Sequence, residues 1–376
     1  MTNNVKHLLE AYHRQKHSTS RLVLATIIES FGSTYQKSGA CMLIDEKGEL
    51  SGLLGGGCFE RDLVLQAKDV FDTGTPKLVF YDMRSFADVI WGLGLGCNGA
   101  VRILLQLFKA EDGYAPLNKL IDCVNANQAG VLLTLYQSGH PKFEAGFSLF
   151  VPENQLADHH AQPFEGAFLA TSRQVLLQRQ ARNETQLIEG FKCKIFYNPI
   201  LPPLQLLLCG AGIDAVPVVQ VAKLLGWRVT VADHRLDPKM RERFAQVDRW
   251  IDVVPEALSD HLNLDQFGAT VLMTHNIELD QRYLQVIAKS KIPFIGLLGP
   301  AQRKDRLLQA LGDLAGPLSN RVFGPVGLDI GAESPEEIAV SIIAGIHAAI
   351  HGYEGQQMND RIKSEVIGYE HEGFHR

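Results

Sequence analysis

Hydrophobic residues in the first half of the chain follow a pattern typical of strands, interrupted by one helix. Apolar runs rich in β-branched residues predict strands at residues 22–29, 40–44, 77–81 and 102–108. Apolar residues recur at helical spacing from residue 59 to residue 71, and Gly74 follows where a left-handed helix end is common. Residues 111–200 are interpreted as a β-rich continuation, with strands at 131–136, 147–151 and 192–197. Residues 1–200 are therefore expected to form an α+β domain, which opens with a polar amphipathic helix.

The pattern changes after the proline-rich residues 198–203. Predicted strands then alternate with predicted helices, the strands at 206–209, 228–232, 269–274 and 293–297 and the helices at 215–225, 279–289 and 335–351. This alternation is typical of a parallel sheet with crossover helices on both faces. The expected fold is therefore α/β. A C-terminal, doubly wound parallel sheet over residues 204–352 follows the N-terminal domain, and residues 356–376 form a polar tail.

Composition narrows the class of protein. The chain has 376 residues, enough for two domains, with 46% hydrophobic and 21% charged residues, as in ordinary globular proteins. A formal net charge of −6 disfavours a general nucleic-acid binder, which needs a basic surface. No apolar run approaches the ~20 residues that span a bilayer, and no signal-peptide pattern begins the chain. We therefore expect a cytoplasmic protein.

The first candidate site is a dinucleotide fingerprint. Gly210 and Gly212 lie between a predicted strand and a predicted helix, an arrangement that lets backbone amides approach a pyrophosphate. Asp233 follows the next predicted strand, about 20 residues on, where an acid binds a ribose hydroxyl. Arg235 nearby could admit a 2′-phosphate, so the choice between NAD, NADP and another nucleotide stays open. Asp214 beside the loop would repel a pyrophosphate, and a glycine turn without a ligand is the alternative. With this fingerprint, the C-terminal sheet is expected to be of the Rossmann type.

A second candidate site combines glycines with a cysteine. Gly55, Gly56 and Gly57 precede Cys58, which lies where a helix is predicted to begin. Three glycines let the backbone approach a ligand, and a helix N-terminus favours a thiolate. Cys58 is therefore a candidate catalytic residue, as a carrier of sulfur, and a candidate ligand for a soft metal. Glu60 in the first turn opposes the thiolate and is a further candidate catalytic residue. A turn with a buried cysteine is the alternative.

Two weaker signals complete the set. Cys97 lies in a second glycine-rich segment, residues 94–99, and is the third candidate catalytic residue, although a hairpin turn also explains that segment. Thr274 and His275 follow another predicted strand at the edge where α/β sheets bind ligands, and their alternative role is to cap the next helix. The six cysteines form no CxxC pair, so we expect most of them to be small buried hydrophobic residues.

The order of these segments resembles the XdhC/CoxI family of molybdenum-cofactor maturation proteins. The resemblance rests on residues 23–45, 53–63 and 92–101 in the first half, and on residues 206–235, 271–280, 292–300 and 323–346 in the second half. It departs from the family pattern at Tyr35–Gln36, at Asn98 and at Pro300. The segments span both expected domains and leave residues 111–200 and the tail without a match.

The resemblance implies an accessory role. Family members are similar to chaperones that bind molybdenum cofactor, support its sulfuration and insert it into xanthine-dehydrogenase-like hydroxylases. It therefore implies the molybdenum cofactor, as molybdopterin or its dinucleotide, and a molybdenum hydroxylase apoenzyme as partner. A cysteine desulfurase partner, a homodimer and NAD(P) as a further cofactor stay open. The alternatives are an NAD(P)-dependent oxidoreductase, favoured by the fingerprint, and an assembly factor whose Rossmann domain binds no ligand.

Overall fold

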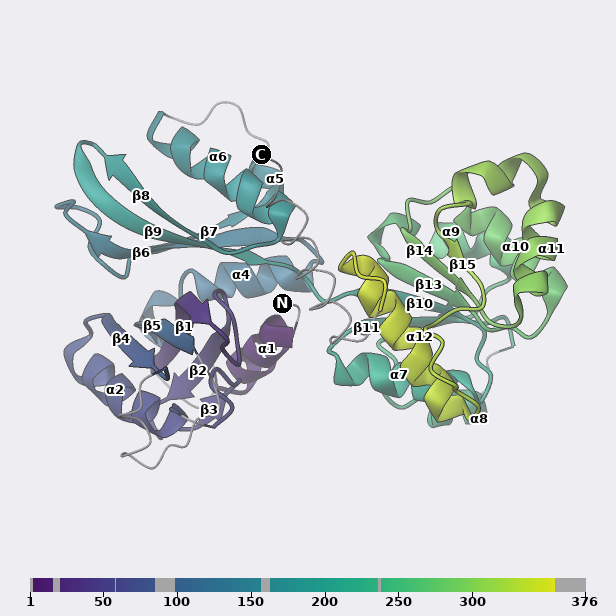
Figure 1. The fold of residues 1–376 in the computed structure, drawn as a ribbon, viewed down its shortest axis with the longest axis horizontal. Coiled ribbons are helices and arrows are strands. Elements are labelled where there is room, and N and C mark those ends of the chain that lie inside the picture. Colours follow the sequence, from purple (N-terminus) through teal and green to yellow (C-terminus); the bar gives the residue numbers. More distant parts are fainter. Residues whose placement is uncertain are drawn as a thin grey trace, which may run out of the picture. The chain divides into compact units, whose positions relative to one another are not determined.

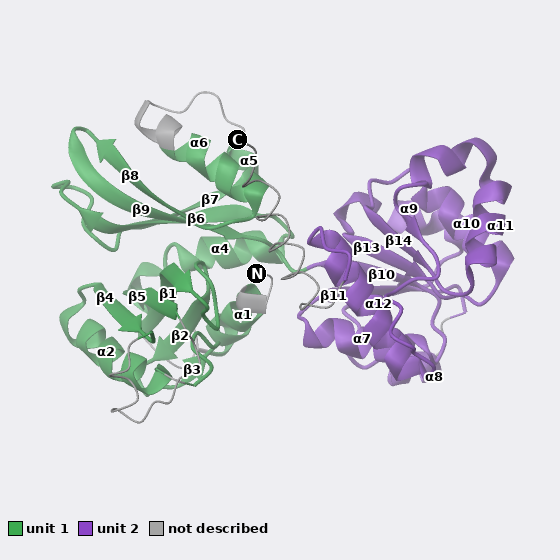
Figure 2. Ribbon diagram, viewed as in Figure 1, with its two compact units in different colours: residues 1–203 green, residues 204–376 purple. Residues whose placement is uncertain are grey.

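The chain divides into two compact units. A computed structural model describes residues 3–15, 21–57, 59–84, 99–156, 163–235 and 238–355. Unit 1 comprises residues 1–203 and unit 2 comprises residues 204–376 (Figure 2). Within the described residues, no helix is long and apolar enough to cross a membrane.

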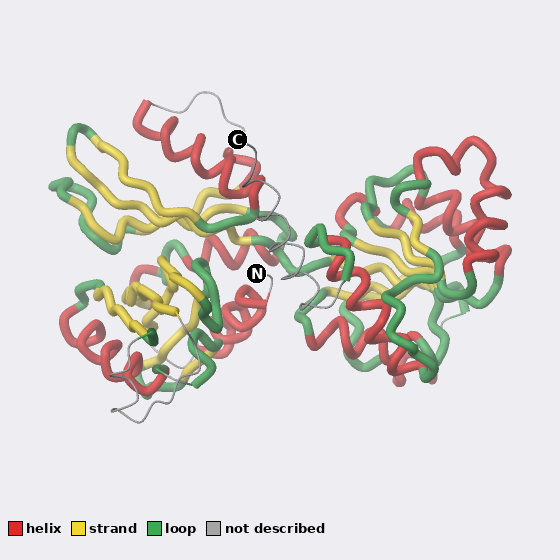
Figure 3. Tube along the Cα trace, viewed as in Figure 1, coloured by secondary structure: helices red, strands yellow, loops and turns green. Residues whose placement is uncertain are grey.

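Unit 1 contains two antiparallel sheets. The first has the strand order β3-β2-β1-β5-β4 and the second the order β7-β6-β9-β8 (Figure 1). Figure 3 shows the strands of both sheets in yellow. The strands of the first sheet are β1 (Arg21–Gly32), β2 (Cys41–Asp45), β3 (Leu50–Ser51), β4 (Lys77–Asp82) and β5 (Gly99–Lys109). Those of the second sheet are β6 (Gly130–Ser138), β7 (Ser148–Pro152), β8 (Arg182–Ile188) and β9 (Phe191–Ile200).

Helices cover both sheets of unit 1. They are α1 (Asn3–Gln15), α2 (Glu60–Thr73), α4 (Leu117–Asn125), α5 (Glu153–Leu156) and α6 (Pro163–Gln178). Leu63, Ala67 and Val70 of α2 pack on one face of the first sheet, because their helical spacing aligns them on one side. Helices α1 and α4 fill the space between the two sheets. The second sheet buries its other face against α6.

Unit 2 is a parallel sheet with helices on both faces. Its strand order is β12-β11-β10-β13-β14-β15, and all neighbours pair in parallel. The strands are β10 (Gln205–Cys209), β11 (Arg228–Ala232), β12 (Arg249–Ile251), β13 (Ala269–Leu272), β14 (Phe294–Leu297) and β15 (Val322–Phe323). The helices are α7 (Ala215–Leu224), α8 (Pro238–Arg243), α9 (Leu258–His261), α10 (Ile277–Ile287), α11 (Ala301–Leu311) and α12 (Pro335–Ile350).

The strand order of unit 2 reverses between β10 and β13. Helices α7 and α12 pack on one face of the sheet, and α10 and α11 pack on the other (Figure 1). The chain therefore leaves β10 and β13 toward opposite faces, which is the point where α/β sheets bind ligands. The expected fold class is confirmed: a Rossmann-type parallel sheet follows an N-terminal α+β unit.

One expectation needs correction. Residues 111–200 contain the three expected strands as β6, β7 and β9, but they also contain the helices α4 and α6 and the strand β8, which were not expected. The buried residues of α4 do recur at helical spacing, but the helix has only 9 residues and its signal is short. The buried side of α6 carries Thr171 and Ser172, which interrupt an apolar stripe.

Candidate functional site

The glycine-rich loop before α2 is held by a buried carboxylate. Oε1 of Glu60 accepts hydrogen bonds from the amides of Gly55 (2.7 Å) and Leu54 (3.2 Å), and Oε2 accepts one from Phe59 (3.2 Å). Glu60 is only 5% exposed. Three amide donors compensate the cost of burying this charge, so the carboxylate fixes the path of the loop.

Different structural features favour glycine at each position of this loop. A Cβ at Gly55 would clash with the ring of Phe59, which is itself stacked on Tyr81 with 4.6 Å between ring centroids. Gly56 (φ +69°) and Gly57 (φ +97°) adopt left-handed conformations that favour glycine. Among the described residues, none has a heavy atom within 4 Å of where a Cβ on Gly57 would stand. The loop thus offers an open backbone surface just before the position of Cys58 in the sequence.

The β1–β2 connection contacts this loop and also contacts the start of β5. The ring of Tyr35, from the β1–β2 connection, lies 3.2 Å from where a Cβ on Gly56 would stand. Gly32 at the end of β1 pairs with Gly99 at the start of β5, and a Cβ on Gly99 would clash with the carbonyl oxygen of Ser33. The glycine-rich loop, residues 32–35 and the start of β5 therefore converge at one end of the first sheet.

This convergence brings together parts of the three N-terminal segments on which the family resemblance rests, residues 23–45, 53–63 and 92–101. The sequence singled out Gly55, Gly56, Gly57 and Glu60, but it missed Tyr35, whose signal was only its place in the first segment. Cys58 and Cys97 lie outside the described residues.

The four cysteines outside these two motifs are buried, as expected for most cysteines of this chain: Cys41, Cys123, Cys193 and Cys209. Burial raises the pKa of Cys41 to about 11, against weaker lowering by hydrogen bonds from Thr26 and Asn198. Burial likewise raises the pKa of Cys209. Within the described ranges, no cluster of three or more His, Cys, Asp or Glu residues could hold a metal ion.

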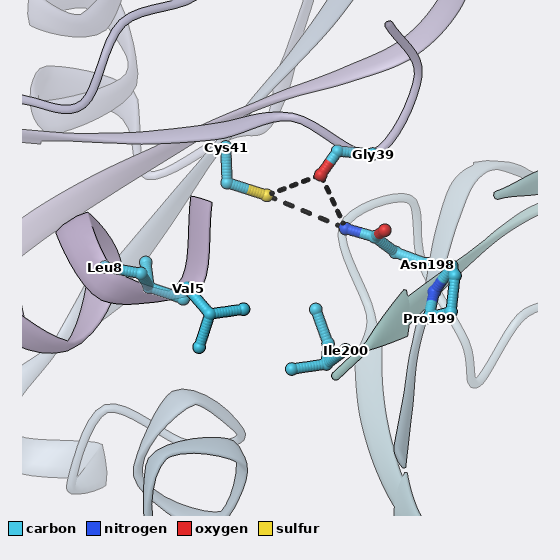
Figure 4. Close-up of a pocket in the computed structure, with 7 residues that line it drawn as sticks. All are labelled: Val5, Leu8, Gly39, Cys41, Asn198, Pro199 and Ile200. Carbon is cyan, nitrogen blue, oxygen red and sulfur yellow. Dashed lines mark hydrogen bonds between the residues drawn. The ribbon is translucent and has the colours of Figure 1, made fainter. Parts of the chain in front are cut away.

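A small pocket in unit 1 lies apart from the predicted site residues. Asn198 Nδ2 donates to the carbonyl oxygen of Gly39 (3.1 Å) and approaches the Cys41 sulfur (3.7 Å) at its polar end (Figure 4). Val5 and Leu8 of α1, with Ile200 of β9, line its apolar end. The thiol is buried and hydrogen-bonded here, which suits packing better than chemistry.

In unit 2, the Gly210 loop passes close to the end of β13. Gly210 has φ +113°, and a Cβ there would lie 2.6 Å from the carbonyl oxygen of Met273. The Gly210 amide also donates to the carbonyl oxygen of Ala232 (2.9 Å). Glycine is therefore required both by the backbone angle and by the close approach of the chain.

Asp233 lies beside this loop and is bonded to it. Its Oδ2 accepts a hydrogen bond from the Ala211 amide (3.0 Å), and its Oδ1 accepts one from the Arg235 amide (2.9 Å). The Arg235 guanidinium forms an ion pair with the same carboxylate (3.1 Å), whose side chain is 1% exposed. Burial raises the pKa of Asp233, but the hydrogen bonds from Arg235 and Ala211 outweigh it and lower the pKa overall. The carboxylate thus fixes the loop, whereas the Arg235 side chain is half exposed.

Thr274 and His275 lie where β13 ends, but they have different surroundings. Thr274 is buried and donates to Asp280 Oδ1 (2.6 Å), while Asp280 Oδ2 pairs with Arg303 (2.6 Å). His275 has a left-handed φ of +56° and its Nε2 lies 2.9 Å from Asp214 Oδ2. The N-cap of α10 is Asn276, whose side chain accepts from the amides of Glu278 and Leu279. Neither Thr274 nor His275 therefore has the capping role considered from sequence.

Family models match both units. Residues 16–82 match the XdhC and CoxI family, and residues 206–346 match the XdhC Rossmann domain. A Bacillus subtilis protein named as a probable xanthine dehydrogenase subunit is 34% identical over 86% of this chain and 92% of its own length. The Escherichia coli molybdenum cofactor insertion chaperone PaoD is 21% identical over 86% of this chain and 82% of its own length.

A solved structure supports the same relationship. A crystal structure described as a xanthine dehydrogenase from Bacillus halodurans has 28% identity and a TM-score of 0.72, covering 93% of this chain and 98% of its own. The match therefore extends through both units, including residues 111–200, where the sequence pattern was least distinctive. From this similarity and from the matched segments at both sites, the chain belongs to the XdhC and CoxI family.

Proposed function

We propose that this protein is an accessory chaperone that binds molybdenum cofactor and inserts it into a xanthine-dehydrogenase-like hydroxylase. The observation that carries the proposal is the convergence of Tyr35, the Gly55–Gly57 loop and Gly99 at one end of the first sheet. These are the segments on which the family resemblance rests. The name of PaoD, a molybdenum cofactor insertion chaperone, supports the same role.

The described residues fit such a ligand. The cofactor is an anionic, phosphate-bearing pterin whose metal is bound by soft thiolate sulfur, and when bound it supplies the metal centre of the client enzyme. The loop presents left-handed glycines with open space at Gly57, so a backbone surface is accessible to an anion. A thiol beside such a surface is a suitable soft ligand.

The residues of the loop have distinct proposed roles. Cys58 is the metal ligand or sulfur carrier, and Cys97, which lies in a second glycine-rich segment two residues before β5 in the sequence, is a second candidate thiol. Glu60 is a positioning residue, because its carboxylate is occupied by three backbone amides. A cysteine desulfurase that delivers sulfur to Cys58 is the partner that this assignment requires for sulfuration.

Unit 2 is proposed to bind the phosphate or nucleotide end of a ligand at the Gly210 loop. Gly210 and Gly212 lie at the strand-order reversal, beside the N-terminus of α7. Asp233 shapes the loop through Ala211, and the half-exposed Arg235 offers a cation to a phosphate. Thr274 positions the end of β13 and His275 contributes a side chain at the same edge.

Activation of an apoenzyme tests this function. A cofactor-free molybdenum hydroxylase is incubated with isolated molybdenum cofactor, a sulfur source and the wild-type protein. We expect more active hydroxylase than with cofactor alone, and a molybdopterin species that co-purifies with the protein. An NAD(P)-dependent oxidoreductase would instead reduce or oxidise the nicotinamide cofactor with a small-molecule substrate and leave the apoenzyme inactive. That outcome would overturn the proposal.

A further inference from the structure

The second glycine of the unit 2 loop is covered by a carboxylate. A Cβ at Gly212 would clash with Oδ1 of Asp214, so this oxygen lies where the side chain of any other residue would begin. In a dinucleotide fingerprint, that space is left open so that the pyrophosphate can approach the backbone. Asp214 therefore places a negative charge in the space that a pyrophosphate would use.

The position of Asp214 is not explained by helix capping. Asp214 is the N-cap residue of α7, where an aspartate ordinarily accepts a hydrogen bond from the first turn, but its side chain makes no such bond. Its Oδ2 instead lies 2.9 Å from Nε2 of His275. The carboxylate is thus directed across the strand-order reversal, from the β10 side to the β13 side.

His275 has an unfavourable backbone conformation that supports this contact. Its φ of +56° is rare for a residue with a side chain, and such conformations persist where surrounding structure requires them. The His275 side chain is 59% exposed and that of Asp214 is 23% exposed, so both are accessible to a ligand at this edge. His275 also lies near Gly212, with Nε2 3.6 Å from the Cβ position.

We propose that Asp214 and His275 form a latch that determines the specificity of the Gly210 loop by excluding free pyrophosphate dinucleotides such as NADH. The inference rests on the proposed function of unit 2 and states which ligands its loop excludes. A pyrophosphate must displace the carboxylate or lie against a like charge, and both outcomes weaken binding. A dinucleotide whose binding depends on this loop loses affinity by that cost. The latch therefore prevents common dinucleotides from competing for the loop.

Calorimetric titration of the full-length protein with NADH tests the latch. Asp214→Asn removes the charge and keeps the size of the side chain, so we expect NADH to bind roughly tenfold or more tightly than to wild type. Asp260→Asn, at an exposed position of helix α9, is the matched control and should bind NADH as wild type does. His275→Ala releases the carboxylate without removing it, and we expect a smaller gain in affinity.

A gain in affinity cannot arise from misfolding, so the design separates the two explanations. Equal NADH affinity of wild type and Asp214→Asn would overturn the latch. An unchanged or weaker affinity in His275→Ala would overturn the role of His275 and make it a direct ligand-binding residue or a bystander. Apoenzyme activation by the wild type is measured separately. Its failure with a gain in Asp214→Asn would refute the proposed function alone, whereas activation without that gain would refute the latch alone.

Discussion

The carboxylate of Glu60 accepts a hydrogen bond from the amide of Gly55 at 2.7 Å, and this bond ties the first turn of α2 to the glycine-rich loop before it. A negative charge near a helix N-terminus is favourable in itself. Here the Glu60 carboxylate also accepts hydrogen bonds from amides of the preceding loop. The loop is therefore preorganised by its own sequence.

Replacement of Glu60 tests this arrangement. In Glu60→Gln, one of the two acceptor oxygens becomes an amide donor, so at least one loop amide loses its partner. We expect a loss of about 1–3 kcal/mol in the free energy of unfolding, the cost of an unsatisfied buried donor. Denaturant unfolding measures it, with the exposed Glu49→Gln as control. Equal stability of the two variants would show that the three hydrogen bonds contribute little.

The glycines should differ in their tolerance of alanine. Gly55→Ala introduces a clash with the Phe59 ring, whereas Gly57→Ala meets open space and faces only an unfavourable φ. We expect Gly57→Ala to cost about 1 kcal/mol and Gly55→Ala about 1–3 kcal/mol. Gly74→Ala, at a left-handed helix end with open space around it, is the control for Gly57→Ala. Thermal unfolding of the three variants measures the order, and a milder effect at Gly55 would contradict the packing described here.

Asp233 should make the protein sensitive to acid. Its folded pKa lies below the ordinary value of 3.8, so its contribution to stability is full above that value and is lost as the pH falls through the folded pKa. Asp233→Asn lacks this titration. We therefore expect the difference in unfolding free energy between wild type and Asp233→Asn to shrink as the pH falls below about 4. Urea unfolding at several pH values provides the measurement, and a constant difference would contradict the assignment.

Cysteine labelling should distinguish the buried thiols from the motif thiols. Burial raises the pKa of Cys41 from 9.0 to about 11, which lowers its thiolate fraction near neutral pH about a hundredfold. Burial also shields Cys123, Cys193 and Cys209. We expect iodoacetamide to modify Cys58 and Cys97 first in the native protein, as followed by peptide mass spectrometry. Rapid modification of Cys41 or Cys209 would argue against the described packing.

The sequence predicts unit 2 better than unit 1. In a parallel sheet buried on both faces, strands are short apolar runs and helices carry their own end signals, as Ser334 and Glu337 do in the capping box of α12. In unit 1, helix α6 buries Thr171 and Ser172. Its sequence therefore has no uninterrupted apolar stripe from which the helix could be predicted. Thr171 donates a hydrogen bond to Glu184 of β8, which lies beside α6 only in the folded chain.

The candidate sites, like the two units, could be predicted from the sequence only in part. A cluster of glycines predicts a backbone with special conformational requirements, because glycine contributes no side chain to packing. The left-handed angles of Gly56, Gly57 and Gly210 agree with that expectation. The sequence does not indicate which groups a carboxylate side chain will face. Glu60 was expected to lie near a thiol and Asp233 near a ligand, whereas Glu60 binds an amide of the loop before its helix and Asp233 binds the amide of Ala211 in the Gly210 loop. The second bond joins segments that approach each other only in the folded chain, which local patterns do not encode.

The central claim is that the loop ending in Cys58 handles the cofactor, and one substitution tests it most directly. Cys58→Ser keeps the size of the side chain but is a far poorer soft ligand. Activation of the molybdenum hydroxylase apoenzyme is compared for wild type, Cys58→Ser and Cys123→Ser, a buried cysteine of α4 that serves as matched control. We predict that Cys58→Ser loses nearly all activation with unchanged thermal stability, while Cys123→Ser keeps it. Full activation by folded Cys58→Ser would contradict the account.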